Sequence, residues 1–396
     1  MKEIKGQFNT AKVFASTVEP SCEAQILELC NEEWVYNSKI RIMADCHSGK
    51  GCVIGTTMTI IDKIVPNLTG VDIGCGVLVT KFDTLSLTLE QVDSIVKRNI
   101  PMGMNSRQSM VVDFTPELDK AICKEAFDPR QVCKSIGSLG GGNHFIEIDK
   151  DDEGNFYLVV HTGSRNFGKR VAEHYQNKAV DYHSKKGLKS TQEIINELKA
   201  KGLQHMIPAE LKKRNAVANE ALTYLEGDLF DCYLNDMHIA QKMASENRKA
   251  IADILCRTMH IKPTEQFETI HNYIDVHAMI LRKGAISAKA GEVCLIPINM
   301  RDGSLICVGK GNEDYNYSAP HGAGRLMSRK QAKRELSLEG FKDTMKDIYS
   351  STVGASTLDE APDAYKPIAE ILENIQDTVT VLKQIKPIYN VKAEEE

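Results

Sequence analysis

Residues 218–259 read ANEALTYLEGDLFDCYLNDMHIAQKMASENRKAIADILCRTM, with apolar side chains at the three- and four-residue spacing of a helix. This stretch is the clearest part of a charged, mostly helical block that we expect over about residues 169–260. Apolar stretches typical of strands lie on both sides of the block, within residues 53–82 and residues 269–308. Strands before and after one helical block favour an α+β fold with a helical insertion. No linker divides the chain, so we expect one compact domain over residues 1–396.

The composition indicates a soluble globular protein with a large core, since 42% of the 396 residues are hydrophobic and 26% are charged. No apolar run approaches the roughly 20 residues that span a membrane, and the N-terminal stretch MKEIKGQFNTAKVFAS has no secretory signal pattern. The eleven cysteines include no C-x-x-C pair, which favours a reducing cytoplasm. The net charge of −5 gives no overall attraction to nucleic acid, so such a partner would need a local basic patch, and residues 325–334 offer one.

The segment SAPHGAGR, residues 318–325, has the residue types of a phosphate site. His321 is a candidate nucleophile, and the glycines that follow it let the backbone approach a ligand closely. Arg325 adds a planar cationic group suited to phosphate. Ser328 then predicts the capped start of a basic helix. The alternative interpretation is a loop with an incidental histidine.

Five polar clusters lie where predicted strands end in loops, and each offers a carboxylate, a thiolate or an imidazole. They are residues 45–49, 71–76, 140–147, 161–165 and 271–272. Their side chains can form a mixed oxygen, sulfur and nitrogen metal site, built from Asp72, Cys75, His144, His161 and His271. Each of these residues alone also fits an ordinary core position. Their joint occurrence, mostly beside glycine, favours a metal site.

Seven motifs together resemble the RtcB family of RNA-splicing ligases, over about residues 40–392. They are MADCHSGKGCVIG, GVDIGCGV, LGGGNHFIE, HTGSRNFG, HNYIDVH, HGAGRLMSR and DEAPDAYK. The resemblance implies one compact domain with mixed β-sheets around the metal site. It also implies an RNA ligase that joins a 2′,3′-cyclic phosphate or 3′-phosphate end to a 5′-hydroxyl end, using GTP and two Mn²⁺ ions.

The same resemblance implies roles for the catalytic and metal-binding residues. His321 would carry GMP as a covalent phosphoramidate, and we expect Asp45 to orient it through the second ring nitrogen. Cys75 would bridge the two metal ions. Asp72 and His144 would complete one metal site, while His161 and His271 would complete the other. We expect Arg165 and Arg325 to contact RNA or nucleotide phosphates.

The nucleotide site implied by the motifs draws on several loops. Its residues would be Asn143, His144, Phe145, Ile146, Glu147, His271, Asn272, Pro297, Ile298, Asn299, Met300, Ser304, His321, Gly322, Ala323, Gly324, Tyr365 and Lys392. Tyr365 would face the guanine. A carboxylate at Glu147 can accept from guanine N1 and N2, and Lys392 can donate to O6.

Departures from the family pattern indicate a divergent bacterial or phage-like branch, used for RNA repair or for tRNA splicing. Family members often have Pro-Asp-Val-His at residues 44–47 and Gly-Ser-Met-Gly at residues 298–301, and Pro320 replaces a Cys or Ser. We expect a monomer, with an activating protein as a further candidate partner. Two alternatives remain open: a paralogue that keeps guanylylation or cyclic phosphodiesterase activity without sealing, and a non-catalytic RNA-binding protein.

Overall fold

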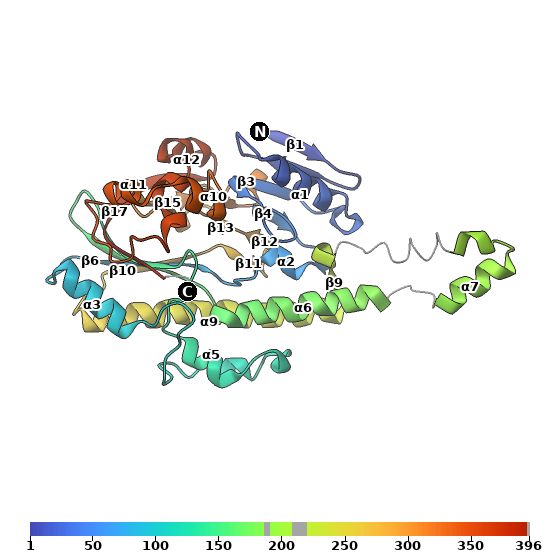
Figure 1. Cartoon of the computed structure of the whole chain (residues 1–396), viewed down its shortest axis with the longest axis horizontal. Helices are drawn as coiled ribbons and strands as arrows, with labels where there is room; N and C mark the ends of the chain where they lie inside the picture. Colours follow the sequence, from blue (N-terminus) through green and yellow to red (C-terminus); the bar gives the residue numbers. More distant parts are fainter. Residues whose placement is uncertain (186–190, 208–219, 394–396) are drawn as a thin grey trace.

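Two β-sheets contain most of the strands of the computed structural model, which describes residues 1–185, 191–207 and 220–393 (Figure 1). The six-stranded sheet has the spatial order β1 (Lys2–Lys5), β2 (Thr10–Val13), β3 (Ile40–His47), β4 (Ile54–Thr59), β12 (Ile280–Lys283) and β11 (Asn272–Asp275). The seven-stranded sheet has the order β10 (Glu265–Ile270), β6 (Gly76–Phe82), β8 (Phe156–Thr162), β7 (Phe145–Lys150), β17 (Val379–Lys392), β15 (Gly303–Gly309) and β14 (Val293–Asn299). Each sheet contains strands from both sides of the helical block, so the prediction of an α+β fold is confirmed.

Five neighbouring strands of the seven-stranded sheet begin or end side by side, and these strand ends form one edge of the sheet that runs across the strands. β10 ends and β6 begins beside each other, because Ile270 pairs with Gly76. On the following strands, His161 pairs with Phe145, and Phe145 pairs with Lys392. The loops that enter or leave these strands therefore meet at one place, and they contain four of the five polar clusters singled out in the sequence.

A single residue joins the two sheets at this edge. β10 ends at Ile270 in the seven-stranded sheet, and β11 begins at Asn272 in the six-stranded sheet. His271 is the residue between them. The strand region predicted from residue 269 onwards is therefore divided here, because the chain changes sheet at His271 and turns after Asp275.

Most helices of the described residues pack around these sheets. Two further short pairs of strands lie outside the two sheets. The helices are α1 (Pro20–Cys30), α2 (Pro66–Thr69), α3 (Leu89–Asn99), α4 (Thr115–Leu118), α5 (Pro129–Ser135), α6 (Arg165–Lys185), α7 (Thr191–Ala200), α9 (Asp228–Thr258), α10 (Arg329–Glu335), α11 (Leu338–Thr344) and α12 (Ile368–Asn374). The short pairs are β13 (Ala285–Ser287) with β16 (Ser318–Pro320), and β5 (Lys63–Ile64) with β9 (Leu225–Glu226).

Helix α9 begins later than the spacing of apolar residues predicts. The quoted stretch starts at residue 218, but the helix starts at Asp228, after Gly227 has turned the chain with a φ of 58°. Leu225 and Glu226 instead form β9, which pairs with β5. The apolar positions before Gly227 thus belong to a different element, and residues 186–190 and 208–219 of the predicted block lie outside the described residues.

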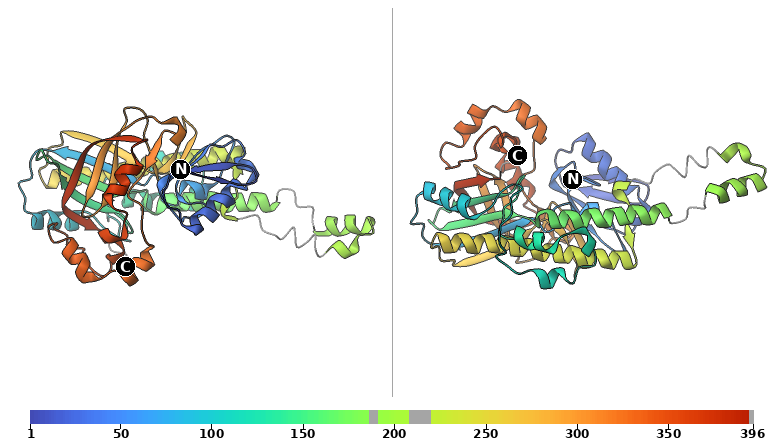
Figure 2. Two further views of the ribbon diagram at one scale, coloured as in Figure 1. Left: turned by 90° about the horizontal axis from the view of Figure 1, so that it is seen from above. Right: turned by 60° about the horizontal axis from the view of Figure 1, so that its bottom comes forward.

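Helix α9 belongs to the core rather than to a peripheral insertion. Tyr233 and Met243 pack into one apolar core, while Ile251 and Leu255 pack into a second core beneath the seven-stranded sheet. Full burial of each such side chain contributes about 1.5–3 kcal/mol. Helix α6 lies alongside α9, whereas α7 lies away from the sheets in both further views (Figures 1 and 2).

Helices α10, α11 and α12 lie beside β15 and β17 (Figure 1). Helix α10 starts where the sequence predicts, because the Ser328 side chain accepts a hydrogen bond from the backbone N–H of Gln331. Among the described residues, no helix combines the length and the apolar character needed to cross a membrane. That residues 1–396 form one domain stays a prediction.

Candidate active site

Five predicted metal ligands meet at the edge where the strand ends gather. The Cys75 Sγ lies 3.5 Å from the Nε2 of His144 and 3.4 Å from the Nε2 of His161. The His144 Nε2 is 3.1 Å from an Asp72 carboxylate oxygen. The donor atoms form two groups, Asp72-Cys75-His144 and Cys75-His161-His271, and within each group they lie within 4.8 Å of one another. Cys75 is the member that both groups share.

This donor set fits a pair of transition-metal ions. Imidazole, carboxylate and thiolate together suit Mn, Fe, Ni or Zn, and a thiolate sulfur can bridge two ions. Burial first, and then the neighbouring histidines, lower the pKa of His161 and of His271 well below 6.5. Both imidazoles are therefore neutral near pH 7, which leaves a nitrogen lone pair for a metal.

The ligand-bearing loops need glycine for steric reasons. A Cβ at Gly163 would lie 2.3 Å from the carboxylate oxygens of Asp72, so only glycine leaves room for that ligand. Gly74 has a φ of +76° and faces α9, where a Cβ would meet the Gln241 Cα at 2.9 Å. The tight turns around Asp72 and Cys75 thus depend on close contact with α9.

Helix α9 also holds these loops by hydrogen bonds. The Arg248 guanidinium is fully buried and donates to the carbonyl oxygens of Gly74 at 2.7 Å and Thr162 at 2.6 Å. It also forms an ion pair with Glu268 at 2.7 Å. Gly74 precedes Cys75 in the sequence, and Thr162 follows His161. Arg248 therefore fixes the distance between the two loops that carry these candidate ligands.

His321 lies next to the cluster and has a carboxylate behind it. The centroids of the His271 and His321 rings are 5.0 Å apart. The His321 Nδ1 is 2.6 Å from an Asp45 oxygen, and the His321 backbone N–H donates to the same oxygen at 3.0 Å. Asp45 is 2% exposed. A proton on Nδ1 is therefore held by Asp45, which leaves the Nε2 lone pair available as a nucleophile.

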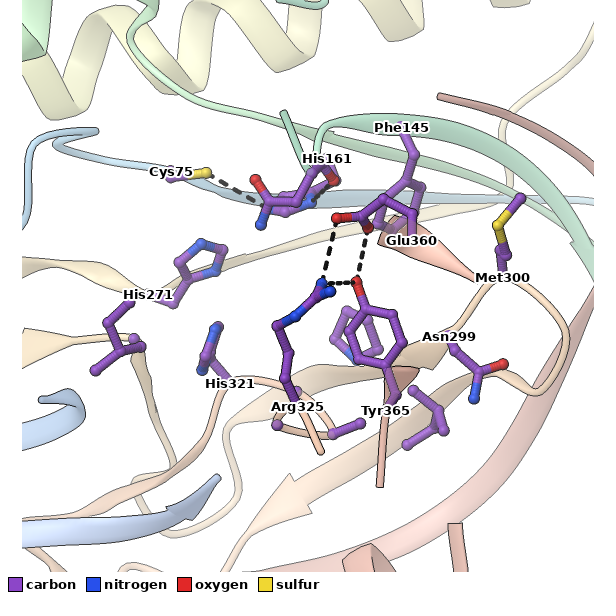
Figure 3. A pocket seen from close by; sticks show the side chains of 18 of the residues that line it. Cys75, Phe145, His161, His271, Asn299, Met300, His321, Arg325, Glu360 and Tyr365 are labelled. Carbon is purple, nitrogen blue, oxygen red and sulfur yellow. Dashed lines mark hydrogen bonds and ion pairs between the residues drawn. The ribbon is translucent and has the colours of Figure 1, made fainter. Parts of the chain in front are cut away.

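A cavity of about 520 Å³ opens beside His321 and the metal cluster (Figure 3). Of the eighteen residues predicted to contact a nucleotide, all but His144 and Ile146 line it. They are Asn143, Phe145, Glu147, His271, Asn272, Pro297, Ile298, Asn299, Met300, Ser304, His321, Gly322, Ala323, Gly324, Tyr365 and Lys392. The Ile146 side chain is instead buried in the core beneath the sheet. His144 faces a second cavity.

Charged and aromatic side chains from β7, β17 and the segment after α11 line another part of the cavity wall. Burial raises the pKa of Glu147 to about 7, against the opposing effects of the Asn390 amide and the Lys392 charge. The Lys392 ammonium donates to Glu360 at 2.6 Å and lies 5.4 Å from the centroid of the Phe145 ring. The Tyr365 hydroxyl donates to Glu360 at 2.7 Å.

Arg325 lines the cavity and is also bound by neighbouring groups of the protein, while its role as a phosphate ligand stays a prediction. Its guanidinium donates to the Met327 carbonyl at 3.1 Å, the Tyr365 hydroxyl at 3.1 Å and the Asp359 carbonyl at 2.5 Å. The guanidinium carbon also lies 4.9 Å from the centroid of the Tyr365 ring. Figure 3 shows Arg325, Tyr365 and Glu360 joined in one network. Its contacts make Arg325 a support for the aromatic wall of the cavity.

Arg165 lies near Asp72 and His144 and does not line the first cavity. It lines a second cavity of about 860 Å³ together with Asp72 and His144. Its guanidinium donates to the Ser138 hydroxyl at 3.1 Å and the Gly103 carbonyl at 2.7 Å. Its backbone has a φ of 55°, an unfavourable value for a side chain of this size. The two cavities therefore approach the metal cluster from two sides.

Several cavity residues were not singled out as site residues from the sequence, and three of them carry ionisable side chains. Glu360 and Arg329 lie in the motifs DEAPDAYK and HGAGRLMSR, and His47 lies in MADCHSGKGCVIG. Motif membership was the available signal, but no local pattern assigned a contact to any of them. The unusual Arg301 forms an ion pair with Asp302 at 2.7 Å, while Asn299 and Met300 line the cavity.

Comparison with known proteins gives one family across most of the chain. The family model for tRNA-splicing ligase RtcB matches residues 25–127 and 124–393. The chain is 28% identical to the RNA-splicing ligase RtcB of Escherichia coli K12, over 95% of each protein. It is 29% identical to RNA-splicing ligase RtcB1 of another Escherichia coli strain, again over 95% of each, and 25% identical to the tRNA-splicing ligase RtcB of Thermococcus kodakarensis, over 85% of this chain and 83% of that protein. A chain whose motifs lie around one cluster of candidate metal ligands and one cavity, and whose length is matched almost completely by this family model, belongs to the RtcB family.

Proposed function

We propose that this protein is an RNA ligase that joins a 2′,3′-cyclic phosphate or 3′-phosphate end to a 5′-hydroxyl end, using GTP and two Mn²⁺ ions. The observation that carries the proposal is the pair of Asp45 and His321 at a cavity wall, beside a cluster in which Cys75 is shared by two sets of metal ligands. A nucleophile activated by a carboxylate and adjacent to two cations suits phosphoryl transfer. Membership of the RtcB family supports the same reaction class.

His321 performs the first step of this mechanism. Its Nε2 lone pair attacks the α-phosphorus of GTP, so a nitrogen–phosphorus bond forms and the bond to pyrophosphate breaks. Asp45 holds the Nδ1 proton and stabilises the positive charge that develops on the ring. When bound at the two ligand groups, Mn²⁺ would neutralise charge on the phosphate oxygens.

The later steps consume the GMP carried by His321. A cyclic phosphate end is opened to a 3′-phosphate by water. That phosphate attacks the GMP phosphorus, which releases His321, and the 5′-hydroxyl oxygen then attacks the RNA phosphate and releases GMP. Arg165 lines the second cavity next to Asp72 and His144, which supports a role in binding an RNA phosphate there.

The guanosine is held in the first cavity by Glu147, Lys392 and Tyr365. Glu147 accepts from guanine N1 and N2, Lys392 donates to O6, and Tyr365 lies against the base. All these side chains belong to one chain, so a single chain supplies this guanosine site.

Incubation of the protein with α-labelled GTP and Mn²⁺ tests the proposal. We expect an acid-labile label on the wild type and none on His321→Ala. His277→Ala is the matched control, because His277 lies in a turn after β11 and should label normally. Labelling of His321→Ala, or no label on the wild type with any divalent metal, would contradict the proposal. Labelling without joining of 3′-phosphate and 5′-hydroxyl RNAs would favour a paralogue that has lost sealing.

A further inference from the structure

The Glu360 carboxylate is the point where four side chains of the cavity wall meet. It accepts from the Lys392 ammonium at 2.6 Å and from the Tyr365 hydroxyl at 2.7 Å. It also lies 2.7 Å from the Arg329 guanidinium and 3.5 Å from that of Arg325. Glu360 is 2% exposed, at the end of a short 3₁₀ turn, Leu358–Glu360, and it lines the first cavity.

The contacts of Glu360 divide between its two oxygens. One oxygen takes Lys392 and Tyr365, the two groups that face the nucleobase in the proposed function. The other oxygen faces the two arginines. Buried cations are tolerated only when paired, so this carboxylate allows three positive groups to share one wall.

The turn that carries Glu360 is also held in place by the neighbouring Asp359. The Asp359 carboxylate forms ion pairs with Arg329 at 2.7 Å and with Lys333 at 3.3 Å, and these tie helix α10 to the turn. Asp359 is also buried, but it does not line the first cavity. Both acids pair with Arg329 of α10, but only Glu360 also contacts Lys392 and Tyr365 and lines the cavity.

We propose that Glu360 is the positioning residue for base selection, because it fixes Lys392 and Tyr365 in the geometry that recognises guanine. This inference rests on the proposed function. An ammonium group has three donors, and Glu360 takes one of them, which orients the others. A fixed donor suits the O6 acceptor of guanine and opposes adenine, which has an amino group at that place. A lysine without its anchor would lose this discrimination along with part of its affinity.

Competition between nucleotides tests the role of Glu360. We would measure guanylylation rates against concentration for GTP, ATP and ITP, with Glu360→Gln, Asp359→Asn and wild type, all loaded with Mn²⁺. Glu360→Gln should raise the KM for GTP by about tenfold or more and lower the preference for GTP over ATP by a similar factor. Inosine keeps O6, so the ratio between GTP and ITP should stay unchanged. Asp359→Asn should keep the wild-type preference for GTP over ATP.

Two further variants separate positioning from a structural role. If Glu360 acts through Lys392, Lys392→Met should lower the GTP preference similarly, and the double variant should lose little more than Lys392→Met alone. Glu360→Gln should retain the metal content of the wild type, since Glu360 is outside both ligand groups. If Glu360→Gln does not fold, Lys392→Met still tests the inference, because an unchanged preference for GTP over ATP would overturn it.

The two proposals fail in different ways. A wild-type protein that takes no label from GTP contradicts the proposed function. A wild-type protein that takes label, with Glu360→Gln retaining its KM for GTP and its preference over ATP, overturns only the role of Glu360.

Discussion

A single carboxylate oxygen of Asp45 accepts hydrogen bonds from both the ring Nδ1 and the backbone N–H of His321, at 2.6 and 3.0 Å. The first contact sets the tautomer of the imidazole, and the second sets the position of the loop that carries it. The nucleophile is thus oriented before any ligand arrives, which reduces the entropy lost in reaching the reactive geometry.

Replacing Asp45 with Asn should slow guanylylation by about 10²- to 10⁴-fold, because the charge that stabilises the developing imidazolium is lost. Single-turnover labelling with α-labelled GTP measures this rate. Metal content should match the wild type, since Asp45 is not a member of either ligand group. A rate within about twofold of the wild type would contradict the role of Asp45.

Replacing Cys75 with Ser should remove metal and activity together. Cys75 is the donor common to both ligand groups, and a hydroxyl is a poorer ligand for transition metals than a thiolate. Elemental analysis after dialysis measures the metal bound per chain. Cys232→Ser is the matched control, because Cys232 is a partly buried residue on α9 outside both groups. Equal metal content in the two variants would argue against a shared thiolate.

The ionisation of Glu147 should make both stability and GTP binding depend on pH. Burial raises the pKa of Glu147 from 4.5 to about 7, so between these values the folded protein keeps a proton that the unfolded chain releases. Stability from this group is therefore full below the lower value and decreases as the pH rises towards 7. GTP affinity should change in the opposite direction, because guanine N1 and N2 need the ionised carboxylate.

Glu147→Gln tests both parts of this prediction. Urea unfolding at about pH 5 and about pH 8 should show a larger loss of stability with rising pH for the wild type than for the variant. Titration with GTP should show affinity that rises through about pH 7 in the wild type and stays flatter in the variant. Identical pH profiles for the two proteins would rule out this role for Glu147.

Replacing Arg248 with Met should destabilise the fold by about 3–5 kcal/mol, because it leaves Glu268 and two loop carbonyls without their buried donor. Chemical denaturation measures the change, and metal affinity should decrease with it. Lys249→Met is the control: this exposed neighbour pairs with Asp253 at 3.0 Å, and its loss should cost about 1 kcal/mol or less. Similar losses for the two variants would mean that Arg248 does not hold the ligand loops.

The local chemistry of the site can be read from the chain because each part carries its own pattern. Glycines beside Cys75, His144 and His321 mark tight turns next to reactive groups, and Ser328 caps α10 as predicted. These features depend on neighbours within a few residues. The resemblance of the motifs to one family then predicted a set of metal ligands and a nucleophile.

Contacts between remote residues were decided by the tertiary structure. Asp45 and His321 are 276 residues apart, and their pairing depends on β3 lying beside the loop after β16. Glu360 and Lys392 meet because β17 ends where its neighbouring strands end, and no periodicity encodes that contact. The same packing brings the Arg325 guanidinium to the Tyr365 hydroxyl, a contact that the sequence does not predict. Residue types and turns are local properties that the sequence determines by itself. The partner of each buried charge is decided by the complete fold. A buried charge without a partner is strongly unfavourable, and here the partners come from distant parts of the chain.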